Sequence, residues 1–559
     1  MMNYQKYKRF EPIKMANRTW PDKVIEKAPK WVSVDLRDGN QALVTPMKIE
    51  EKVEMFQLLV DMGFKEIEVG FPSSSQIEYD FLRLLVEENL VPDDVTIQVL
   101  TQAREHLIRK TFEALEGLPR AIVHIYNSTS TLQRDVVFNK SKEEIKQIAI
   151  DGVKLVKELS QEFTGEVILE YSPESFTGTE LDYAVEVCEA VMDTWGASKE
   201  NKVIINLPST EEKSTPNIYA DQIEYMCNKF SDRERVIVSL HTHNDRGTGV
   251  AASELGIMAG ADRVEGTLFG NGERTGNVDI VTLALNLFSQ GIDPELELSN
   301  INEIRRVFEK VTKMEVGPRH PYAGKLVFTA FSGSHQDAIN KGIRKYHERQ
   351  SQYWEVPYLP VDPSDLGRAY EPIVRINSQS GKGGVAFVLE SMYGFHLPRG
   401  LQIDFAKLIQ NISEVEGEVS PERVYDTFVD NYVENTNPYK FVSQKLIDIS
   451  EEGEYERKAL VVVSHDGKNI ELEGYGNGPI NAVKDALNKL GGVYAHLVDY
   501  SEHALTSGSS SNAASYVLLR EKGSARQEYG VGVHPNITTA TTMAIISALN
   551  RLYQSKKGD

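Results

Sequence analysis

Two histidines, His241 and His243, follow a short β-branched run at residues 236–238. Side chains on a strand alternate between its two faces, so residues two apart point the same way. Two imidazoles side by side at the end of a strand are suited to bind one divalent metal ion. The alternative is a pair of histidines held by hydrogen bonds in the core or in a loop. The metal interpretation therefore requires an oxygen ligand and a reacting group from elsewhere in the chain.

Strand-like and helix-like segments alternate along residues 31 to 268. Short apolar or β-branched runs, which we expect to be strands, occupy residues 31–35, 66–71, 96–100, 121–126, 166–170, 202–206, 236–240 and 263–268. Amphipathic runs, which we expect to be helices, occupy residues 48–62, 77–88, 144–161, 180–194, 220–230 and 249–259. Eight strands that alternate with helices predict an α/β fold of the (β/α)8 TIM barrel type. The structural alternative is a doubly wound open sheet.

The loops after five of the expected strands favour the barrel, because they are rich in polar residues and glycine. They occupy residues 35–41, 170–179, 207–210, 241–247 and 269–277. Taken singly, each loop has the composition of an ordinary turn, since Gly, Pro, Asn, Asp and Ser favour turns for backbone reasons. In a barrel, all five loops meet at one face. Asp38 then provides a carboxylate beside the two histidines, with open positions left for a substrate.

The composition is that of an acidic globular protein. The 559 residues include 82 acidic and 61 basic side chains, which give a formal net charge of −21. This charge argues against a nucleic acid or an anionic membrane as the main partner, so an anionic substrate needs a local cation or a metal ion. The two cysteines, Cys188 and Cys227, lie in helix-like runs and predict no disulfide framework. Without an apolar signal segment or a run of about 18 apolar residues, we expect a cytoplasmic protein.

Three motifs in these loops resemble those of the 2-isopropylmalate synthases. They are DLRDGNQ at residues 35–41, HTHNDRG at 241–247 and GNGERTGN at 270–277. The resemblance continues in NRTWP at 17–21, FSGSHQDAIN at 331–340, NSQSGKGG at 377–384 and the C-terminal region. It therefore covers nearly the whole chain, in the long form known from actinobacteria and fungi. The wider relatives of this family are the homocitrate and citramalate synthases.

The resemblance implies a metal-dependent condensation of acetyl-CoA with 2-oxoisovalerate (3-methyl-2-oxobutanoate), which yields 2-isopropylmalate and CoA. This reaction is the first committed step of leucine biosynthesis, and leucine is the expected feedback inhibitor. Mg²⁺ is the expected divalent ion, with Mn²⁺ and Zn²⁺ as alternatives, K⁺ is a candidate activator, and the expected assembly is a homodimer. Three alternative functions stay open: a homocitrate or citramalate synthase that uses another 2-oxo acid, a metal-dependent lyase on the same barrel, and an inactive amino-acid sensor.

The chemistry of the motif residues, together with the resemblance, gives each of them an expected role. Asp38, His241 and His243 are the expected metal ligands, and the resemblance adds Asn277 to them. Arg37 precedes Asp38, stays protonated at working pH and suits the stabilisation of a developing oxyanion. An Arg next to an Asp at a turn is otherwise an ordinary surface ion pair.

The remaining expected site residues bind substrate or move protons. The expected substrate-binding residues are Arg37, Thr210 and Glu273. The resemblance implies that Glu174, His335 and Tyr370 transfer protons and form the catalytic set together with Arg37. The alternative for His335 is a histidine at a helix N-terminus that makes only local hydrogen bonds. The sequence leaves open which of these three is the base.

The alternation of strands and helices stops near residue 310, and a chain of this length is expected to form more than one domain. We assign residues 1–30 to an N-terminal arm, 31–310 to the catalytic barrel, 311–435 to mainly helical linker subdomains and 436–559 to a C-terminal α+β domain. In the last domain, strand-like runs at 459–464 and 470–475 precede a helix at 481–490. Similar runs at 515–520 and 528–533 precede a helix that ends at 548–552. The pattern predicts a βββα unit that occurs twice.

Both helices of this repeat begin at a proline that is followed closely by an isoleucine. The free N–H groups of a helix N-terminus suit the carboxylate of an amino acid, and apolar neighbours suit its side chain. The resemblance implies that this is a regulatory domain that binds leucine, whereas the alternative is a domain that only holds subunits together. The expected leucine contacts are Gly478, Pro479, Ile480, Leu497, Tyr500, Ala504 and Ile537.

Overall fold

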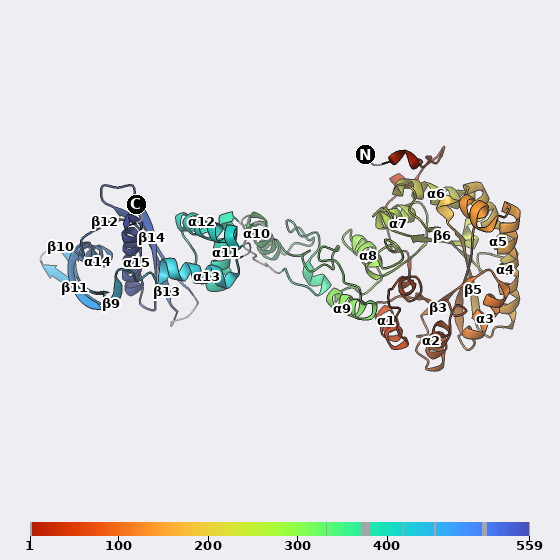
Figure 1. Cartoon of the computed structure of the whole chain (residues 1–559), viewed down its shortest axis with the longest axis horizontal. Coiled ribbons are helices and arrows are strands. Elements are labelled where there is room, and N and C mark those ends of the chain that lie inside the picture. Colours follow the sequence, from red (N-terminus) through yellow and green to blue (C-terminus); the bar gives the residue numbers. More distant parts are fainter. Residues whose placement is uncertain are drawn as a thin grey trace. The chain divides into compact units, whose positions relative to one another are not determined.

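A computed structural model describes residues 3–330, 333–370, 381–416, 419–451, 454–505 and 511–557. The chain forms two compact units (Figure 1). The first unit comprises Met1–Phe328 with Val361–Ala369, and the second comprises Thr329–Pro360 with Tyr370–Asp559. Within the described residues, no helix is long and apolar enough to span a membrane.

The first unit contains a closed barrel of eight parallel strands in the order β1 to β8, which confirms the predicted TIM barrel. Its strands are β1 (Lys30–Ser33), β2 (Glu66–Gly70), β3 (Thr96–Gln102), β4 (Arg120–Ser128), β5 (Glu166–Glu174), β6 (Val203–Ser209), β7 (Val236–Thr242) and β8 (Arg263–Gly266). Pairing of β1 with β8, for example Val32 with Glu265, closes the barrel. The open-sheet alternative is wrong, since an open sheet leaves two unpaired edges.

Helices surround the barrel, and three of them were not predicted from the sequence. The helices are α1 (Ile49–Asp61), α2 (Gln76–Glu87), α3 (Glu105–Leu115), α4 (Lys142–Glu162), α5 (Leu181–Trp195), α6 (Pro216–Lys229), α7 (Gly249–Met258), α8 (Ile280–Phe288) and α9 (Ile301–Thr312). Sequence analysis missed α3, α8 and α9. In α8 nearly every residue is buried, so an amphipathic pattern is absent. In α3 the pattern is present, because Ile108, Phe112 and Leu115 are buried at helical spacing.

A π-helical turn, η3 (Asp35–Gly39), continues β1 at the carboxyl face of the barrel. The carbonyl of Val34 accepts the backbone N–H groups of Arg37 at 3.2 Å, Asp38 at 2.9 Å and Gly39 at 3.1 Å. This backbone arrangement fixes two consecutive charged side chains at the mouth of the barrel. Other short turns are η1 (Tyr4–Lys6), η2 (Trp20–Asp22), η4 (Gln133–Phe138), η5 (Phe176–Gly178), η6 (Arg233–Arg235), η7 (Leu268–Gly270), η8 (Pro363–Leu366) and η9 (Val429–Val433).

The N-terminal arm is anchored to α6 by charged hydrogen bonds. Arg18 Nη2 donates to Asp221 Oδ2 at 2.7 Å, and the indole Nε1 of Trp20 donates to Asp221 Oδ1 at 2.8 Å. The backbone N–H of Trp20 donates to Glu224 Oε1 at 3.1 Å. Both carboxylates are buried and hydrogen-bonded, and Asp221 also faces the cation of Arg18, which lowers the cost of burying its charge.

The second unit contains helices followed by the predicted βββα repeat, which is confirmed. Its leading helices are α10 (Gly333–Arg349), α11 (Gly381–Tyr393), α12 (Arg399–Glu416) and α13 (Pro421–Phe428). The repeat comprises β9 (Lys440–Glu451), β10 (Glu454–His465), β11 (Lys468–Gly476) and α14 (Pro479–Asn488), then β12 (Ala495–Ala504), β13 (Ala513–Glu521), β14 (Gln527–His534) and α15 (Ile537–Lys557). Each half is an antiparallel three-stranded sheet with its middle strand in the centre, in the orders β11-β10-β9 and β12-β13-β14.

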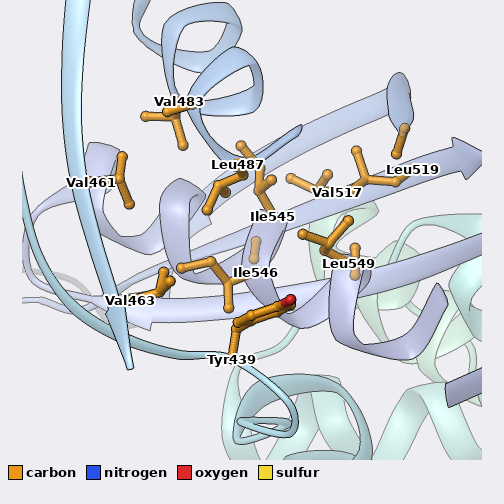
Figure 2. Packing of buried hydrophobic residues seen from close by; sticks show 14 of the residues in the cluster. Tyr439, Val461, Val463, Val483, Leu487, Val517, Leu519, Ile545, Ile546 and Leu549 are labelled. Atoms are coloured by element: carbon orange, nitrogen blue, oxygen red, sulfur yellow. The ribbon is translucent and has the colours of Figure 1, made fainter. Parts of the chain in front are cut away.

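Apolar side chains from both halves form one core around the two helices of the repeat (Figure 2). β10 contributes Val461, β13 contributes Val517, and α15 contributes Ile545 and Leu549. The opposite face of β13 presents Tyr516 to a second core, which contains residues of α11, α12 and α13. Because side chains alternate along a strand, one sheet packs on its own helices with one face and on the leading helices with the other.

The helix of the second half packs so closely on its sheet that β14 carries glycines at the contact. A Cβ added at Gly530 would lie 2.2 Å from the carbonyl oxygen of Ala544 and from the backbone N of Ala548. We expect Gly530→Ala to destabilise the second unit by about 1–3 kcal/mol, the typical cost of overpacking a core. Gly317→Ala is the control, because nothing lies within 4 Å of the added Cβ there. Calorimetric unfolding checks this, and equal transition temperatures for the two variants would contradict it.

Candidate metal centre and catalytic pocket

The carboxyl end of the barrel holds a pocket of about 280 Å³. Its lining includes most of the barrel residues expected to do chemistry, namely Arg37, Asp38, Glu174, Thr210, His241, His243 and Glu273. Asn277 lies directly behind this lining, where its Nδ2 donates to Asp38 Oδ2 at 2.7 Å. The loops after β1, β5, β6, β7 and β8 therefore contribute to a single site, as expected for a TIM barrel.

Asp38, His241 and His243 form a buried cluster with the spacing of metal ligands. Their candidate ligand atoms all lie within 4.8 Å of one another. The Oδ2 atom of Asp38 is 3.1 Å from His241 Nε2 and 3.9 Å from His243 Nε2. Two imidazoles and a carboxylate with an open side suit a divalent ion that also binds a substrate.

Two unpaired atoms beside this cluster support the same interpretation. The Oδ1 atom of Asn277 and the Nδ1 atom of His243 are buried and have no hydrogen-bond partner among the described residues. Buried polar atoms are nearly always hydrogen-bonded, so an exception indicates a missing partner such as an ion or a water molecule. The cluster thus fits a divalent ion, with Asn277 next to the ligands as the family resemblance implied.

Glu265 orients His241 from behind. The Nδ1 of His241 donates to Glu265 Oε2 at 2.9 Å, so Nε2 faces Asp38. Burial lowers the pKa of His241, but the hydrogen bonds with Asp38 and Glu265 outweigh it and raise this pKa to about 9. Burial and the neighbouring charge of His241 lower the pKa of His243 to about 4. A metal ion bound here would therefore displace a proton from His241.

The Arg37 guanidinium is held between two carboxylates. Its Nη1 lies 2.8 Å from Asp38 Oδ1, and its Nε donates to Glu68 Oε1. Its side chain is only 11% exposed, so the pair of Arg37 and Asp38 is a buried pair and differs from an ordinary surface ion pair. Arg37 also lines the pocket, where a fixed guanidinium can stabilise developing negative charge.

Thr210 and Glu174 occupy the side of the pocket formed by the loops after β5 and β6. The hydroxyl oxygen of Thr210 accepts the backbone N–H of Ser175 at 2.9 Å, which leaves the hydroxyl proton for another acceptor. Burial raises the pKa of Glu174, although the Arg37 charge opposes this shift. Glu273 is exposed at the rim and accepts a hydrogen bond from Gln41 at 2.9 Å.

A layer of polar side chains inside the barrel was missed by sequence analysis. His124 Nδ1 hydrogen-bonds Glu68 Oε2 at 3.0 Å, and His124 Nε2 hydrogen-bonds the Ser172 hydroxyl at 2.8 Å. Asn206 Nδ2 donates to Ser172 at 3.1 Å and to Glu265 at 3.0 Å. Each of these residues follows a buried apolar residue of its strand, and alternate positions of a barrel strand face the interior. That alternation was the available signal, but the strands were assigned from their apolar residues alone.

His335 and Tyr370 belong to the second unit, and their catalytic roles stay predictions. His335 is exposed in the first turn of α10 and stacks on Tyr358, with ring centroids 4.1 Å apart. Tyr370 is half-buried, and its buried hydroxyl has no hydrogen-bond partner in the described part of the chain.

The expected leucine contacts lie at the two helix entrances and on β12. Gly478 precedes α14, whose first residues are Pro479 and Ile480, and Ile537 begins α15. On β12, Leu497 and Tyr500 pack at the margin of the core around α14 and α15, and Ala504 is exposed at the end of the strand. The Tyr500 hydroxyl lies 3.3 Å from Thr541 Oγ1, which brings it to the first turns of α15. Their role in binding leucine also stays a prediction.

Removal of one imidazole tests the metal centre directly. Loss of a residue that hydrogen-bonds a metal ligand typically weakens metal binding by about 10–100-fold. Because His243→Ala removes a ligand itself, we expect it to weaken Mn²⁺ binding by at least that factor. A binding titration with Mn²⁺ measures this, while circular dichroism checks that the barrel is folded. His106→Ala, which changes an exposed histidine of α3, is the control and should bind Mn²⁺ like the parent. Equal affinities for the two variants would mean that the ligand set is wrong.

Three family models match consecutive parts of the chain. The model described as HMGL-like matches residues 28–308. The model described as alpha-isopropylmalate synthase, post-catalytic domain-like, matches residues 325–390, and the LeuA allosteric (dimerisation) domain matches residues 418–553.

Full-length relatives carry the same name as the family that the motifs resemble. The 2-isopropylmalate synthase of Clostridium acetobutylicum is 58% identical over 98% of this chain and 99% of the relative. The 2-isopropylmalate synthase of Rhizobium johnstonii is 54% identical over 99% of both chains, and that of Rhodospirillum rubrum is 53% identical over 98% of both. The motifs at the barrel mouth, the order of the matched domains and this identity along the whole length agree, and the chain belongs to the 2-isopropylmalate synthase family.

Proposed function

We propose that this chain condenses acetyl-CoA with 2-oxoisovalerate to give 2-isopropylmalate and CoA, and that leucine inhibits it. The observation that carries the proposal is the cluster of Asp38, His241 and His243 beside Arg37 in one pocket. The relatives named 2-isopropylmalate synthase support the same reaction. A homodimer is part of the proposal and is supported by the match to a domain described as a dimerisation domain.

Asp38, His241 and His243 would hold a divalent ion, and Asn277 would complete the ligand set. When bound, such an ion polarises the ketone of the 2-oxo acid and neutralises the alkoxide that forms. We favour Mg²⁺ in this role, with Mn²⁺ or Zn²⁺ as alternatives that the same donor atoms accept. Activation by K⁺ rests on the family resemblance alone.

The apolar wall of the pocket is suited to a substrate with a small branched side chain. Phe71, Leu100 and Pro208 line the same pocket as the metal cluster and suit an isopropyl group. The arginines in the lining are Arg37 and Arg274, and both already face carboxylates. A second substrate carboxylate, as in 2-oxoglutarate, would therefore lack a free basic partner. This balance favours 2-oxoisovalerate over the substrate of a homocitrate synthase.

The residues of the pocket have complementary tasks in the condensation. A base removes a proton from the methyl group of acetyl-CoA, and the resulting carbanion forms a carbon–carbon bond with the ketone carbon. The carbon–oxygen π bond of the ketone opens in this step, and the alkoxide oxygen then takes up a proton. Arg37 stabilises the oxyanion, and the Thr210 hydroxyl donates to the substrate carboxylate. Water then adds to the thioester, the carbon–sulfur bond breaks, and CoA leaves as its thiol.

Three residues are candidates for these proton transfers: Glu174, His335 and Tyr370. Glu174 lines the pocket, and burial raises its pKa, which favours a group that both accepts and donates protons. Glu273, at the rim, is placed to contact the larger parts of a substrate.

A panel of 2-oxo acids tests the proposal. The protein is mixed with acetyl-CoA, Mg²⁺ or Mn²⁺ and one 2-oxo acid at a time, and release of free thiol is followed. Release with 2-oxoisovalerate as the preferred partner is the expected result. Preference for pyruvate or 2-oxoglutarate would assign a citramalate or homocitrate synthase. Cleavage of a hydroxy-oxo acid without condensation would assign a lyase, and no turnover at all would favour a sensor.

The guanidinium of Arg37 has a geometry that an ammonium cannot reproduce. We expect Arg37→Lys to lower kcat by roughly 10²–10³, the typical cost of losing one well-placed oxyanion donor, although the charge is kept. Steady-state thiol release measures this. The matched control is Arg109→Lys, an exposed pair with Glu105 on α3, which should keep parental kcat. A fall smaller than about fivefold would reduce Arg37 to an ion-pair residue.

Leucine inhibition should depend on the two helix entrances of the C-terminal domain, which we place at residues 436–559. We expect Tyr500→Ala and Gly478→Val to keep condensation activity while raising the leucine concentration needed for inhibition, since a coupling of about 1–3 kcal/mol is typical of allostery. Inhibition curves measure this, with Tyr475→Ala, an exposed tyrosine of β11, as the control. If leucine inhibits both variants as strongly as it inhibits the parent protein, the domain serves only to associate subunits.

A further inference from the structure

A lysine and a glutamate form a buried ion pair behind the catalytic turn. Lys52, in the first turns of α1, has no exposed side-chain surface, and its Nζ lies 2.5 Å from Glu78 Oε1. Glu78 is the third residue of α2, and its side chain is 15% exposed. The pair therefore joins the helices that follow β1 and β2, at the end of the barrel where the pocket opens.

Each partner also contacts the backbone of a segment that lines the pocket. Lys52 Nζ donates to the carbonyl of Leu36 at 3.4 Å, inside the turn η3 that carries Arg37 and Asp38. Glu78 Oε2 accepts the backbone N–H of Phe71 at 3.4 Å, at the apolar wall of the pocket. The ion pair thus connects the loop that carries Arg37 and Asp38 to the loop whose Phe71 lines the apolar wall of the pocket.

The end of β2 leaves space for the carboxylate of Glu78. A Cβ added at Gly70 would lie 2.0 Å from Glu78 Oε2 and 3.2 Å from its carboxylate carbon. Glycine at the end of β2 therefore leaves space that the Glu78 side chain fills. The hydrogen bond from the Phe71 N–H to Glu78 therefore depends on the glycine with which β2 ends.

The position of Lys52 is unfavourable for stability alone. A cation in the first turns of a helix opposes the helix dipole, and a fully buried ammonium loses its hydration. Burial also lowers the pKa of Lys52, while the Glu78 charge opposes this shift. Apolar residues of similar volume often replace buried ion pairs without loss of stability, so the presence of a buried charged pair at this place in the fold needs another explanation.

We infer that Lys52 and Glu78 are a positioning pair that holds the Arg37–Asp38 turn and the Phe71 wall in register with each other. Neither residue lines the pocket, so both act through the backbone of the loops that they contact. The kinetic part of this inference rests on the proposed condensation, whereas its metal-binding part does not.

The test compares the variants Lys52→Met, Glu78→Gln and the double variant with a matched surface pair. Lys65 Nζ and Asp94 Oδ2 are also 2.5 Å apart, but their side chains are 62% and 64% exposed, so Lys65→Met is the control. Four quantities are measured for each protein: the Mn²⁺ affinity by titration, kcat and KM for 2-oxoisovalerate, and the midpoint of thermal unfolding.

We expect Lys52→Met to bind Mn²⁺ at least about tenfold more weakly than Lys65→Met, as for other residues that support metal ligands, and to lose kcat and raise KM. The double variant buries no unpaired charge, so it should recover thermal stability without recovering Mn²⁺ affinity or kcat. It also carries the test if Lys52→Met fails to fold.

Two results would overturn the inference. Lys52→Met with the Mn²⁺ affinity and kcat of Lys65→Met would show that the turn does not need the pair. A double variant that regains affinity and kcat together with stability would make the pair structural only. If the parent releases no thiol with any 2-oxo acid, the proposed condensation fails, and the Mn²⁺ affinities alone decide the role of the pair.

Discussion

Asp38 has 5% of its surface exposed, and a carboxylate at that depth is tolerated only when every oxygen meets a donor or a cation. Oδ1 faces Arg37 at 2.8 Å, and Oδ2 faces Asn277 at 2.7 Å and His241 at 3.1 Å. Burial tends to raise the pKa of Asp38, but Arg37 and the histidines outweigh it and hold this pKa well below its usual range. The loops after β1, β7 and β8 must therefore converge whenever the barrel closes.

Deeper in the barrel, Arg263 neutralises buried carboxylates, as Arg37 does in the pocket. It is fully buried, with Nη1 2.8 Å from Glu265 and Nε 2.6 Å from Glu66. Glu265 in turn holds His241, so one continuous chain of charged contacts runs from the start of β8 to Asp38. Breaking a buried pair typically costs 3–5 kcal/mol, because the remaining charge is left without a partner. The same contacts thus stabilise the barrel and fix the orientation of a metal ligand.

The sequence predicted the barrel and the cluster because both depend on local patterns that repeat. Strand periodicity places His241 and His243 on one face, and the barrel rule brings the loop of Asp38 to the same end of the strands. Motif resemblance added Asn277, which the structure places against Asp38. Other features depend on contacts between distant segments. Lys52 looks like an ordinary surface residue of an amphipathic helix, and only the closed barrel reveals that Glu78 and the Leu36 carbonyl surround it.

For the polar layer inside the barrel, by contrast, the sequence does contain a local signal, namely polar residues at alternate strand positions. The apolar residues beside them give a stronger signal for a buried strand. Glu68 and His124 each lie between apolar residues, and those apolar residues identify the two runs as strands. A polar residue inside a buried strand carries more information than its apolar neighbours, because it must find a partner on the same face. The polar residues at alternate positions of the eight strands therefore predict much of this layer.

Local charge explains how a protein with a net charge of −21 can attract anionic substrates. Without an ion, Arg37 is balanced by Asp38 and Glu68, so the mouth of the barrel has no excess of positive charge. A divalent ion on the cluster would reverse this balance and leave one net positive charge, the complement of a 2-oxo acid with one carboxylate. A substrate with two carboxylates would exceed that charge unless another cation were free, and Arg274 is already paired with Asp245 at 2.7 Å. The selectivity proposed for this site therefore follows from charge as well as from the apolar wall.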